Sequence, residues 1–353
     1  MVSVAVMVKN LTSGGAEKQA VLLAKALSAR YSTHFIVWNG GKVHDRYLDM
    51  LADSPVEVHC VKGGYFARLF AVKKLVSKIR PQVIFSSLTA ANFFASILGV
   101  MYKIPVVTSL RCTWFPKHKL VAERFTTNRL ATLTVANSNT GKEVFIAAGF
   151  NSEKMEFIPN CFEKIDPPVE RTQGEAVRVI SVGRFVPEKD YGTAIKAMAK
   201  AVVVNKSISY DIVGYGELEA EVRQAVKDAG IEDYVRILIN PNNIPELLRQ
   251  ADIYLSTSVS EGTSNAILEA MNADLPVVAT RVGDNDRMVE PKVNGYLHAV
   301  GDVDGLAESV VKLAADATSR AKMGAESKRI LAETYSADKF AANYIGLVER
   351  LTK

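Results

Sequence analysis

Short runs of apolar residues recur along this chain, and longer stretches with helical spacing separate them. In the first half, six runs have the length and β-branched content of strands: 2–8, 33–38, 56–61, 83–86, 106–109 and 133–136. Between them, residues 16–29 and 67–79 repeat apolar positions every three or four residues, the spacing of an amphipathic helix. Nearly continuous apolar strands that alternate with helices predict a parallel sheet covered on both faces.

The same alternation starts again after a polar stretch at 163–175, which contains Pro167 and Pro168. Five further apolar runs follow it: 177–183, 209–213, 235–238, 253–256 and 277–280. We therefore expect an α/β protein with two doubly wound domains, residues 1–165 and 166–335, joined by this polar linker. Ligands of such domains bind at the carboxyl ends of the strands, so residues directly after strands are the candidates for chemistry.

The composition is that of a globular protein long enough for two domains, with 353 residues, 48% hydrophobic and 23% charged. Cys60, Cys112 and Cys161 form no Cys-x-x-Cys pair, which argues against a disulfide framework or a zinc motif and suits a reducing compartment. The apolar start lacks the basic region and cleavage site of a signal peptide. The longest weakly polar run, 90–102, is shorter than the roughly 20 residues that span a bilayer. We expect a cytoplasmic protein without a transmembrane helix.

The net charge of +5 conceals two halves of opposite sign. Residues 1–165 contain 21 Lys and Arg against 10 Asp and Glu, whereas the remainder contains 22 against 28. The first half, with its charge of +11, is therefore expected to meet something anionic. Nucleic acid, anionic lipid and a phosphorylated acceptor are all compatible with the charge alone.

Two short groups of residues follow the first predicted strand of each half. Gly14 and Gly15 stand at a turn into a helix, where a ligand can approach the backbone and the helix N-terminus attracts phosphate. A tight turn would explain the same pair, and no Gly-x-Gly-x-x-Gly is present there. Arg184 and Lys189 could clamp a diphosphate, Arg as a bidentate fork and Lys as a point charge. Taken alone, solvated surface charges explain them more simply.

The most informative segment is 260–271, Ser-Glu-Gly-Thr-Ser-Asn-Ala-Ile-Leu-Glu-Ala-Met, which follows a predicted strand. Thr263 or Ser264 can cap a helix that begins there, so that its free N–H groups face the ligand edge. Glu261 precedes this helix and Glu269 lies within it, so one carboxylate can reach a sugar hydroxyl while the other reaches the ribose of the same nucleotide. A glutamate on an apolar helix face is costly without a partner, which disfavours a simple capped surface helix.

This Glu-x7-Glu segment, with Gly14 and Gly15 before it and Arg184 and Lys189 between, resembles family 4 of the retaining glycosyltransferases, which have the GT-B fold. The resemblance spans nearly the whole chain and includes residues 158–160, 213–216, 276–280 and 294–295. It implies two Rossmann-like domains whose parallel sheets face each other across a deep cleft that holds the active site. It also implies that a last helix, within 336–353, packs back on the first domain.

The resemblance also implies roles for individual residues. Arg184 and Lys189 would hold the donor diphosphate and stabilise the leaving phosphate. Glu261 would hold the donor sugar, and Glu269 would bind the ribose. The remaining donor contacts are expected from Gly14, Gly15, Ile239, Asn240, Gly262, Thr263, Ser264, Asn265, Ala266 and Ile267. Catalysis would then be charge stabilisation of a departing diphosphate, without a metal or a cofactor and with attack on the same face of the sugar.

The chain departs from the family pattern after the predicted strand at 106–109. Similar enzymes often have a histidine there that points at the donor sugar, whereas this chain has Leu110, Arg111 and Cys112. Either Arg111 serves instead, as a catalytic residue from the first domain, or His118 does. Asn160-Cys161 likewise replaces the more common Asn-Gly.

Asp284-Asn285-Asp286 resembles the Asp-x-Asp metal motif of the other major glycosyltransferase fold. It follows the predicted strand at 277–280, a position in a second domain that is wrong for that motif. We therefore expect a loop with solvated carboxylates and no bound metal.

Two basic stretches, 62–80 and 103–129, also contain aromatic residues. These are Tyr65, Phe66 and Phe70 in the first stretch and Trp114, Phe115 and Phe125 in the second. Basic helices with exposed aromatics bind anionic membranes, but aromatics buried beneath solvated charges would explain either stretch equally well. The charge of the first half favours peripheral contact with the inner face of a membrane, which suits the lipid-linked saccharide acceptors of similar enzymes.

The sequence therefore predicts transfer of a sugar from a nucleotide donor, UDP-linked rather than GDP-linked, to a saccharide or lipid-linked glycan in surface polysaccharide biosynthesis. The alternative enzyme class is an NAD(P)-dependent oxidoreductase or a nucleotide-sugar epimerase. Against it, Gly214-Tyr-Gly216 lacks the third glycine of the dinucleotide fingerprint, and the Tyr335…Lys339 pair lies far from a nucleotide site. A non-catalytic scaffold for nucleic acid rests on charge alone, and we expect no nucleic-acid partner.

Overall fold

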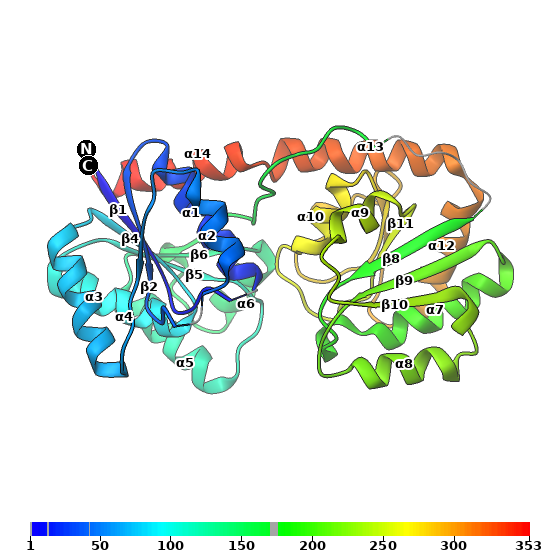
Figure 1. Ribbon diagram of the computed structural model, residues 1–353, viewed down its shortest axis with the longest axis horizontal. Helices are drawn as coiled ribbons and strands as arrows, with labels where there is room; N and C mark the ends of the chain where they lie inside the picture. Colours follow the sequence, from blue (N-terminus) through cyan, green and yellow to red (C-terminus); the bar gives the residue numbers. More distant parts are fainter. Residues whose placement is uncertain (1, 13, 42, 170–175) are drawn as a thin grey trace. The chain divides into compact units, whose positions relative to one another are not determined.

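The computed structural model of the chain describes residues 2–12, 14–41, 43–169 and 176–353. These residues form two compact units (Figure 1). The first unit consists of Met1–Glu163 together with Ala337–Lys353, and the second of Lys164–Ser336. Residues 170–175, which end the predicted linker, lie outside the described part of the chain.

Within the described residues, the first unit is built on a seven-stranded parallel sheet. Its strands are β1 (Ser3–Val8), β2 (Ser32–Val37), β3 (Glu57–Cys60), β4 (Val83–Ser87), β5 (Val106–Leu110), β6 (Leu133–Ala136) and β7 (Met155–Phe157). Their order across the sheet is β3-β2-β1-β4-β5-β6-β7. The chain leaves β1 toward one side of the sheet and β4 toward the other, so the carboxyl ends of these two strands form a topological switch point.

Helices cover both faces of this sheet. They are α1 (Gly15–Ser28), α2 (Asp45–Ala52), α3 (Tyr65–Ile79), α4 (Thr89–Tyr102), α5 (Lys117–Phe125) and α6 (Asn139–Ala147), with a π-helical turn η1 (Thr126–Leu130) and a 3₁₀ turn η2 (Ser152–Lys154). Phe35 packs with α1 and α2 on one face, whereas the next residue, Ile36, packs with α3 and α4 on the other. Successive strand residues point to opposite faces, so burial on both faces explains the continuous apolar runs.

The second unit repeats this architecture on a sheet that has six parallel strands among the described residues. The strands are β8 (Val177–Val182), β9 (Ile208–Gly214), β10 (Val235–Ile239), β11 (Ile253–Ser256), β12 (Val277–Thr280) and β13 (Gly295–His298). Their order is β10-β9-β8-β11-β12-β13. The switch point of this sheet therefore lies between β8 and β11.

Helices again flank the sheet of the second unit (Figure 1). They are α7 (Tyr191–Val204), α8 (Glu219–Asp228), α9 (Ile244–Arg249), α10 (Asn265–Asn272), α11 (Asn285–Met288), α12 (Val303–Ala315) and α13 (Ala317–Thr334), with 3₁₀ turns η3 (Pro187–Lys189) and η4 (Glu232–Tyr234). Apolar residues of α7, α8 and α12 share one core with the sheet. Helix α10 contacts α9 and α13.

The last helix, α14 (Ala337–Leu351), belongs to the first unit, where it contacts α1. Its buried residues join the core that contains Phe35: they are Phe340, Tyr344, Leu347 and Val348. An ion pair between Arg350 and Glu156 lies on the surface beside it. Apolar burial of one helix face thus holds the end of the chain against the first sheet.

The described part of the predicted linker is fixed to the second unit. The N–H groups of Asp166 and Val169 donate to the side chains of Asn272 (2.9 Å) and Asp274 (2.7 Å). Lys328 donates to the carbonyl oxygen of Asp166 (3.1 Å) and forms an ion pair with Asp274. Residues 164–169 are therefore an ordered part of the second unit.

All eleven predicted strands are present, and those at 133–136, 253–256 and 277–280 have the predicted bounds. Strands β7 and β13, at one edge of each sheet, were not predicted. Among the described helices, none is both long enough and apolar enough to span a bilayer.

Candidate functional site

The switch point of the second unit brings together two loops that sequence analysis singled out. Strands β8 and β11 are parallel neighbours, so the loops after them leave the same edge of the sheet. The first loop carries Gly183, Arg184 and Lys189, and the second carries Glu261. Topology alone therefore places the predicted diphosphate residues beside the first glutamate of the Glu-x7-Glu segment.

An ion pair links the two loops. The Lys189 ammonium lies 2.5 Å from Glu261 Oε1, which also accepts a 2.8 Å hydrogen bond from the Ser258 hydroxyl. Both charged side chains are largely shielded from solvent. Each charge therefore offsets the other's desolvation cost, and the Glu261 carboxylate is held in one place.

Backbone contacts hold the same loops in register. The Thr257 hydroxyl lies within hydrogen-bond distance of the carbonyl oxygens of Lys189 (3.1 Å) and Asp190 (2.8 Å). The N–H of Val259 donates to the carbonyl of Glu188 (2.9 Å). Lys189 and Glu261 are thus positioned by the backbone as well as by their mutual attraction.

Two buried tyrosines support this edge from below. Tyr254 donates to the carbonyl oxygen of Val182 (3.2 Å), and Tyr191 donates to that of Gly183 (3.0 Å). Burial is the main cause that raises the pKa of Tyr254, and the charges of Glu261 and Glu269 add to it. Tyr254 thus lies within the electrostatic reach of both glutamates, Glu261 before α10 and Glu269 within it.

Helix α10 carries the second glutamate, and its N-terminus points to a difference from the sequence prediction. Ser264 is the N-cap residue, but its side chain makes no capping hydrogen bond. Both Thr263 and Ser264 are buried, so their side chains pack into the protein. Of the two predicted capping residues, Ser264 occupies the N-cap position without the expected side-chain hydrogen bond, and the first-turn residues Asn265 and Ala266 are half-buried.

The remaining predicted donor residues of the second unit lie around the same edge. The Arg184 side chain is exposed, and among the described residues it has no ion-pair partner. Ile239 ends β10 with 41% exposure, and Asn240 follows it with a left-handed φ of 44°. The Asn240 N–H donates to the carbonyl of Gly214 (3.0 Å), which fixes this turn beside β9.

The Asp284-Asn285-Asp286 segment differs in part from its prediction. Asp286 is exposed, as expected, but Asp284 is only 1% exposed and Asn285 is fully buried. The Asn285 amide donates to the carbonyl of Thr280 (2.9 Å), which pulls the segment against the end of β12. The prediction of solvated carboxylates is therefore wrong for Asp284.

In the first unit, the predicted glycines form the turn into α1. Gly14 is the N-cap residue and Gly15 the first helical residue. A side chain at Gly14 would collide with the buried Glu17 carboxylate, since a Cβ there would lie 2.1 Å from Glu17 Oε2. Tyr47 donates to the Gly14 carbonyl (3.0 Å). A larger residue at Gly14 would therefore require the Glu17 side chain to move.

Arg111 is held by three hydrogen bonds within the first unit. Its guanidinium donates to Ser109 Oγ (2.9 Å), to Asn160 Oδ1 (3.0 Å) and to the Tyr344 hydroxyl (3.4 Å). It therefore connects the end of β5 to the segment after β7 and to α14. His118, the alternative, is exposed on the first turn of α5. Among the described side chains, no hydrogen bond joins Arg111 to His118.

Two family descriptions match consecutive parts of the chain. Residues 13–163 match "Glycosyltransferase Family 4", and residues 163–330 match "Glycosyl transferases group 1". The chain belongs to glycosyltransferase family 4. The two matched parts correspond to the two units, with the join at the boundary between them.

Curated relatives of this chain include amylovoran biosynthesis glycosyltransferase AmsK of Erwinia amylovora, 32% identical over 178 residues that cover 48% of this chain and 44% of AmsK. They also include the UDP-Gal:alpha-D-GlcNAc-diphosphoundecaprenol alpha-1,3-galactosyltransferase of Escherichia coli, 25% identical over 204 residues that cover 53% of this chain and 52% of the relative. The chain spans about half the length of these curated relatives.

Solved structures show the fold. Anabaena Alr3699/HepE, crystallised in complex with UDP, superposes with a TM-score of 0.83 and 22% identity over 99% of this chain and 100% of that chain. The expected GT-B fold, with its two parallel sheets, is thereby confirmed.

Several residues at this candidate site were missed from the sequence. Tyr191, Tyr254, Thr257 and Ser258 support the ion pair, but each lies within an apolar or polar run that gave no separate signal. Gly283 had a signal, because a glycine shortly after a strand often permits close backbone approach. Its φ is +54°, and a Cβ there would lie 2.3 Å from the Glu261 carbonyl oxygen.

Proposed function

We propose that this chain transfers a sugar from a UDP-sugar to a saccharide or lipid-linked glycan acceptor, with retention of the anomeric configuration. The observation that carries the proposal is the ion pair of Lys189 and Glu261 at the switch point of the second unit, directly before the helix that carries Glu269. A cation that can hold a diphosphate there stands beside a carboxylate that can accept hydrogen bonds from sugar hydroxyls.

The donor would displace part of the present ion pair. Lys189 would turn to the diphosphate together with the exposed Arg184, which leaves Glu261 free to accept hydrogen bonds from the donor sugar. The N-terminus of α10, which begins at Asn265, would offer its N–H groups to the phosphates. Glu269, one turn further along α10, would bind the ribose.

The reaction would proceed on one face of the sugar. The acceptor oxygen forms a bond to the anomeric carbon as the bond to the diphosphate oxygen breaks, and the acceptor proton passes to the departing phosphate. Arg184 and Lys189 stabilise the charge that develops on the diphosphate, which is the term that accelerates this step. No residue of the chain needs to act as a covalent nucleophile. The Cys112 thiol is unsuited to that role, because burial raises its pKa to about 11 and so disfavours the thiolate.

Relatives support a UDP-linked donor and a glycan acceptor. HepE binds UDP and UDP-glucose in its crystals, and the Escherichia coli relative is named for UDP-Gal and for a lipid-linked diphosphate acceptor. AmsK is named for amylovoran biosynthesis. In this chain, Ile239 and Asn240 would contact the base from the turn after β10.

A thermal-shift screen tests the donor class. UDP, GDP, ADP, their common sugar conjugates and NAD(P) are added to the wild type, to Glu269→Ala and to Glu290→Ala, an exposed glutamate after α11 that serves as the control. We expect UDP or a UDP-sugar to raise the melting temperature of the wild type and of Glu290→Ala, and not that of Glu269→Ala. Stabilisation by NAD(P) alone would overturn the proposal in favour of an oxidoreductase.

Membrane contact of the first unit is the second part of the proposal. We define the aromatic–basic surface as the exposed aromatics Tyr65, Phe66 and Phe70 of α3 with the adjacent lysines Lys73 and Lys74. Phe66 is 73% exposed and Phe70 is 70% exposed, so they are not core residues. Trp114 and Phe125, at 68% and 51%, are exposed as well. Exposed aromatics beside lysines favour binding to an anionic bilayer that carries a lipid-linked acceptor.

Vesicle sedimentation tests this contact. We expect the chain to bind vesicles that contain phosphatidylglycerol more strongly than phosphatidylcholine vesicles, and Phe66→Ser/Phe70→Ser to weaken that binding. Val203→Ser/Val204→Ser is the matched control, because these valines at the end of α7 are equally exposed, at 70% and 71%, on the second unit. Equal loss in both double variants would argue against a specific membrane surface.

A further inference from the structure

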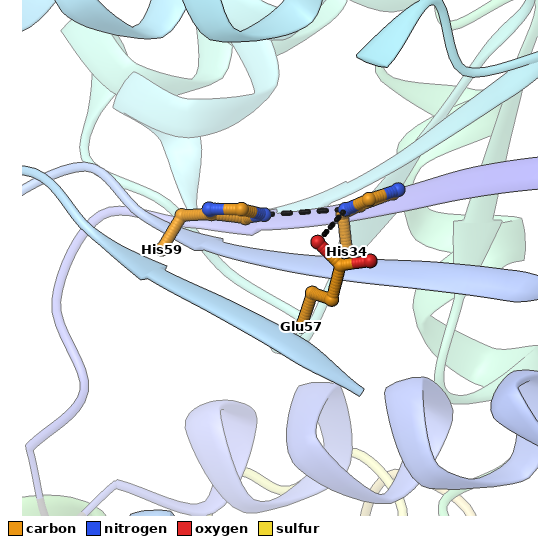
Figure 2. A group of neighbouring side chains, drawn as sticks. All are labelled: His34, Glu57 and His59. Atoms are coloured by element: carbon orange, nitrogen blue, oxygen red, sulfur yellow. Dashed lines mark hydrogen bonds and ion pairs between the residues drawn. The ribbon is translucent and has the colours of Figure 1, made fainter. Parts of the chain in front are cut away.

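Three side chains with metal-binding atoms converge at one edge of the first sheet, and none of them is among the residues proposed to bind the donor. His34 lies on β2, and Glu57 and His59 lie on the edge strand β3. His34 is the register partner of Glu57, and His59 is two residues further along β3 on the same face. Figure 2 shows the Nε2 edge of His59 and the Glu57 carboxylate both turned toward the His34 ring.

The distances among these atoms match the edges of a metal coordination polyhedron. His34 Nδ1 lies 3.2 Å from His59 Nε2 and 3.5 Å from Glu57 Oε2. Metal–ligand bonds of about 2.0–2.1 Å in a tetrahedral zinc site place neighbouring ligand atoms about 3.3–3.4 Å apart. All three ligand atoms lie within 4.8 Å of one another. The exposed Glu57 can close the remaining edge by rotating its side chain.

Hydrogen bonding satisfies this arrangement only in part. His34 Nδ1 faces two atoms that can accept a hydrogen, His59 Nε2 and Glu57 Oε2, but it carries at most one. The other nitrogen of His34 lies 3.5 Å from the Ser32 hydroxyl, which favours orienting the ring with Nδ1 toward the cluster. A metal ion in place of the single hydrogen would use the lone pairs of all three atoms at once.

The His34 ligand is held rigidly, whereas the Glu57 ligand can change its side-chain conformation. The His34 side chain is 10% exposed, whereas that of Glu57 is 65% exposed. His34 is therefore fixed by packing, and Glu57 faces solvent, from which an ion can enter. Two imidazoles and a carboxylate suit zinc and similar transition metals rather than magnesium or calcium, which prefer oxygen ligands.

We propose that His34, Glu57 and His59 bind one zinc-class divalent ion, which ties the edge strand β3 to β2. Three protein ligands leave the fourth position for water. Strand β3 has four residues, and they are mostly exposed, so apolar packing holds it weakly. A metal bond across the strand pair would compensate for that. The site is independent of sugar transfer, for which no metal is proposed.

The test uses untagged, chelator-treated full-length chain titrated with Co²⁺ and then with Zn²⁺. We expect one ion per chain, a visible Co²⁺ spectrum that Zn²⁺ abolishes, and a higher melting temperature with Zn²⁺. His59→Gln and Glu57→Gln should each weaken Zn²⁺ binding at least about tenfold. His118→Ala, which removes an exposed histidine of α5, should leave it unchanged.

The neighbouring Lys78 of α3 gives a second, opposite test. Burial is the main cause that lowers the pKa of His59, and the positive charge of Lys78 adds to it, so the same charge should repel a bound cation. Lys78→Gln should therefore strengthen Zn²⁺ binding, whereas the exposed Lys73→Gln on the same helix should change it less. A stoichiometry below one ion per chain would overturn the proposal. So would Zn²⁺ binding that is unchanged in both Glu57→Gln and His59→Gln. Glu57 is largely exposed, so loss of binding in Glu57→Gln does not reflect misfolding.

Discussion

The Lys189–Glu261 pair couples stability and function at a single contact. Each side chain is shielded from solvent and has the other as its charged partner. Replacing either one by alanine leaves the other with an unmatched charge in a partly buried place, which costs about 1–3 kcal/mol. In the proposed reaction, the same two residues hold the diphosphate and the donor sugar.

We therefore expect Lys189→Ala and Glu261→Ala to abolish sugar transfer and to weaken UDP binding at least about tenfold, with the fold retained. Lys227→Ala, which removes an exposed lysine near the end of α8, is the control and should bind UDP normally. Calorimetric titration with UDP and circular dichroism separate the two effects. Normal UDP binding by Lys189→Ala would remove this lysine from the donor site.

Glu123 shows a different residue-scale effect, a buried acid that lies outside the donor site. It is 1% exposed on α5, and Asn92 donates to both carboxylate oxygens at 3.2 Å. Burial raises the pKa of Glu123, and the hydrogen bonds from Thr89 and Asn92 oppose that rise only in part. The folded state therefore keeps the Glu123 proton to a higher pH than the unfolded chain does.

The raised pKa of Glu123 gives the free energy of unfolding a pH dependence whose sign can be measured. Between the ordinary pKa of 4.5 and the raised value, the folded state binds more protons than the unfolded state. The free energy of unfolding therefore falls as the pH rises through that window. Glu123→Gln should reduce this slope, and Glu143→Gln, an exposed glutamate of α6, should not. Denaturant titrations at several pH values measure it, and an unchanged slope in Glu123→Gln would contradict the assignment.

At the scale of elements, the loop after β12 supports the loop after β11 through one glycine. Gly283 has a left-handed φ of +54°, and a Cβ there would lie 2.3 Å from the Glu261 carbonyl oxygen. Gly230, after α8, has a similar φ of +63° but no atom within 4 Å of its hypothetical Cβ. The two glycines therefore share the left-handed backbone conformation and differ in the contact.

Gly283→Ala and Gly230→Ala should each lose about 1 kcal/mol through the left-handed backbone. Gly283→Ala should lose more, because the new methyl group must displace the backbone of Glu261, and its UDP affinity should fall at least about tenfold. Chemical denaturation and UDP titration of both variants make the comparison. If both variants bound UDP equally well, the contact with Glu261 would be irrelevant to the donor site.

The sequence predicts elements best where both faces of a strand are buried. Strands such as β11 and β12, in the middle of the second sheet, have uninterrupted apolar runs and the predicted bounds. Of the edge strands, β3 and β10 were predicted, whereas β7 has three residues, one of them Glu156, and β13 begins with Gly295. A Cβ at Gly295 would lie 1.9 Å from the Val277 carbonyl oxygen, so close strand packing requires a residue that weakens the strand signal.

At the candidate site, the sequence predicts local features and misses contacts between distant residues. Glu261 and Glu269 lie in one continuous segment, so their spacing is visible in the sequence. The Lys189–Glu261 pair joins residues 72 positions apart, and the Arg111–Tyr344 hydrogen bond joins residues 233 positions apart. No periodicity predicts such contacts, because they depend on which strands become neighbours. The exposure of Phe66 and Phe70 also needed the structure, since the sequence fits a buried or an exposed position equally well.

At the scale of the whole molecule, the chain crosses from the first unit to the second and returns. Each unit has its own sheet and core, and α14, which follows the second unit in the sequence, contributes residues to the core of the first. Tyr344 is the central contact of that return, because it is fully buried against Phe85 and Phe340 and accepts a hydrogen bond from Arg111. The stability of the first unit thus depends on the last residues of the chain.

Tyr344→Ala should therefore destabilise the first unit by about 3 kcal/mol or more, the usual cost of removing a buried aromatic side chain. Asn343→Ala, at the neighbouring exposed position of α14, should change stability by less than about 0.5 kcal/mol. UDP identifies which unit unfolds, since it is proposed to bind residues of the second unit and should raise only that unit's transition. Denaturation of Tyr344→Ala with and without UDP should show the UDP-insensitive transition at lower denaturant and the UDP-sensitive one unchanged. A common shift of both transitions would mean that α14 contributes to the stability of both units. The hydrogen bond from Arg111 to Tyr344 would then also affect the stability of both.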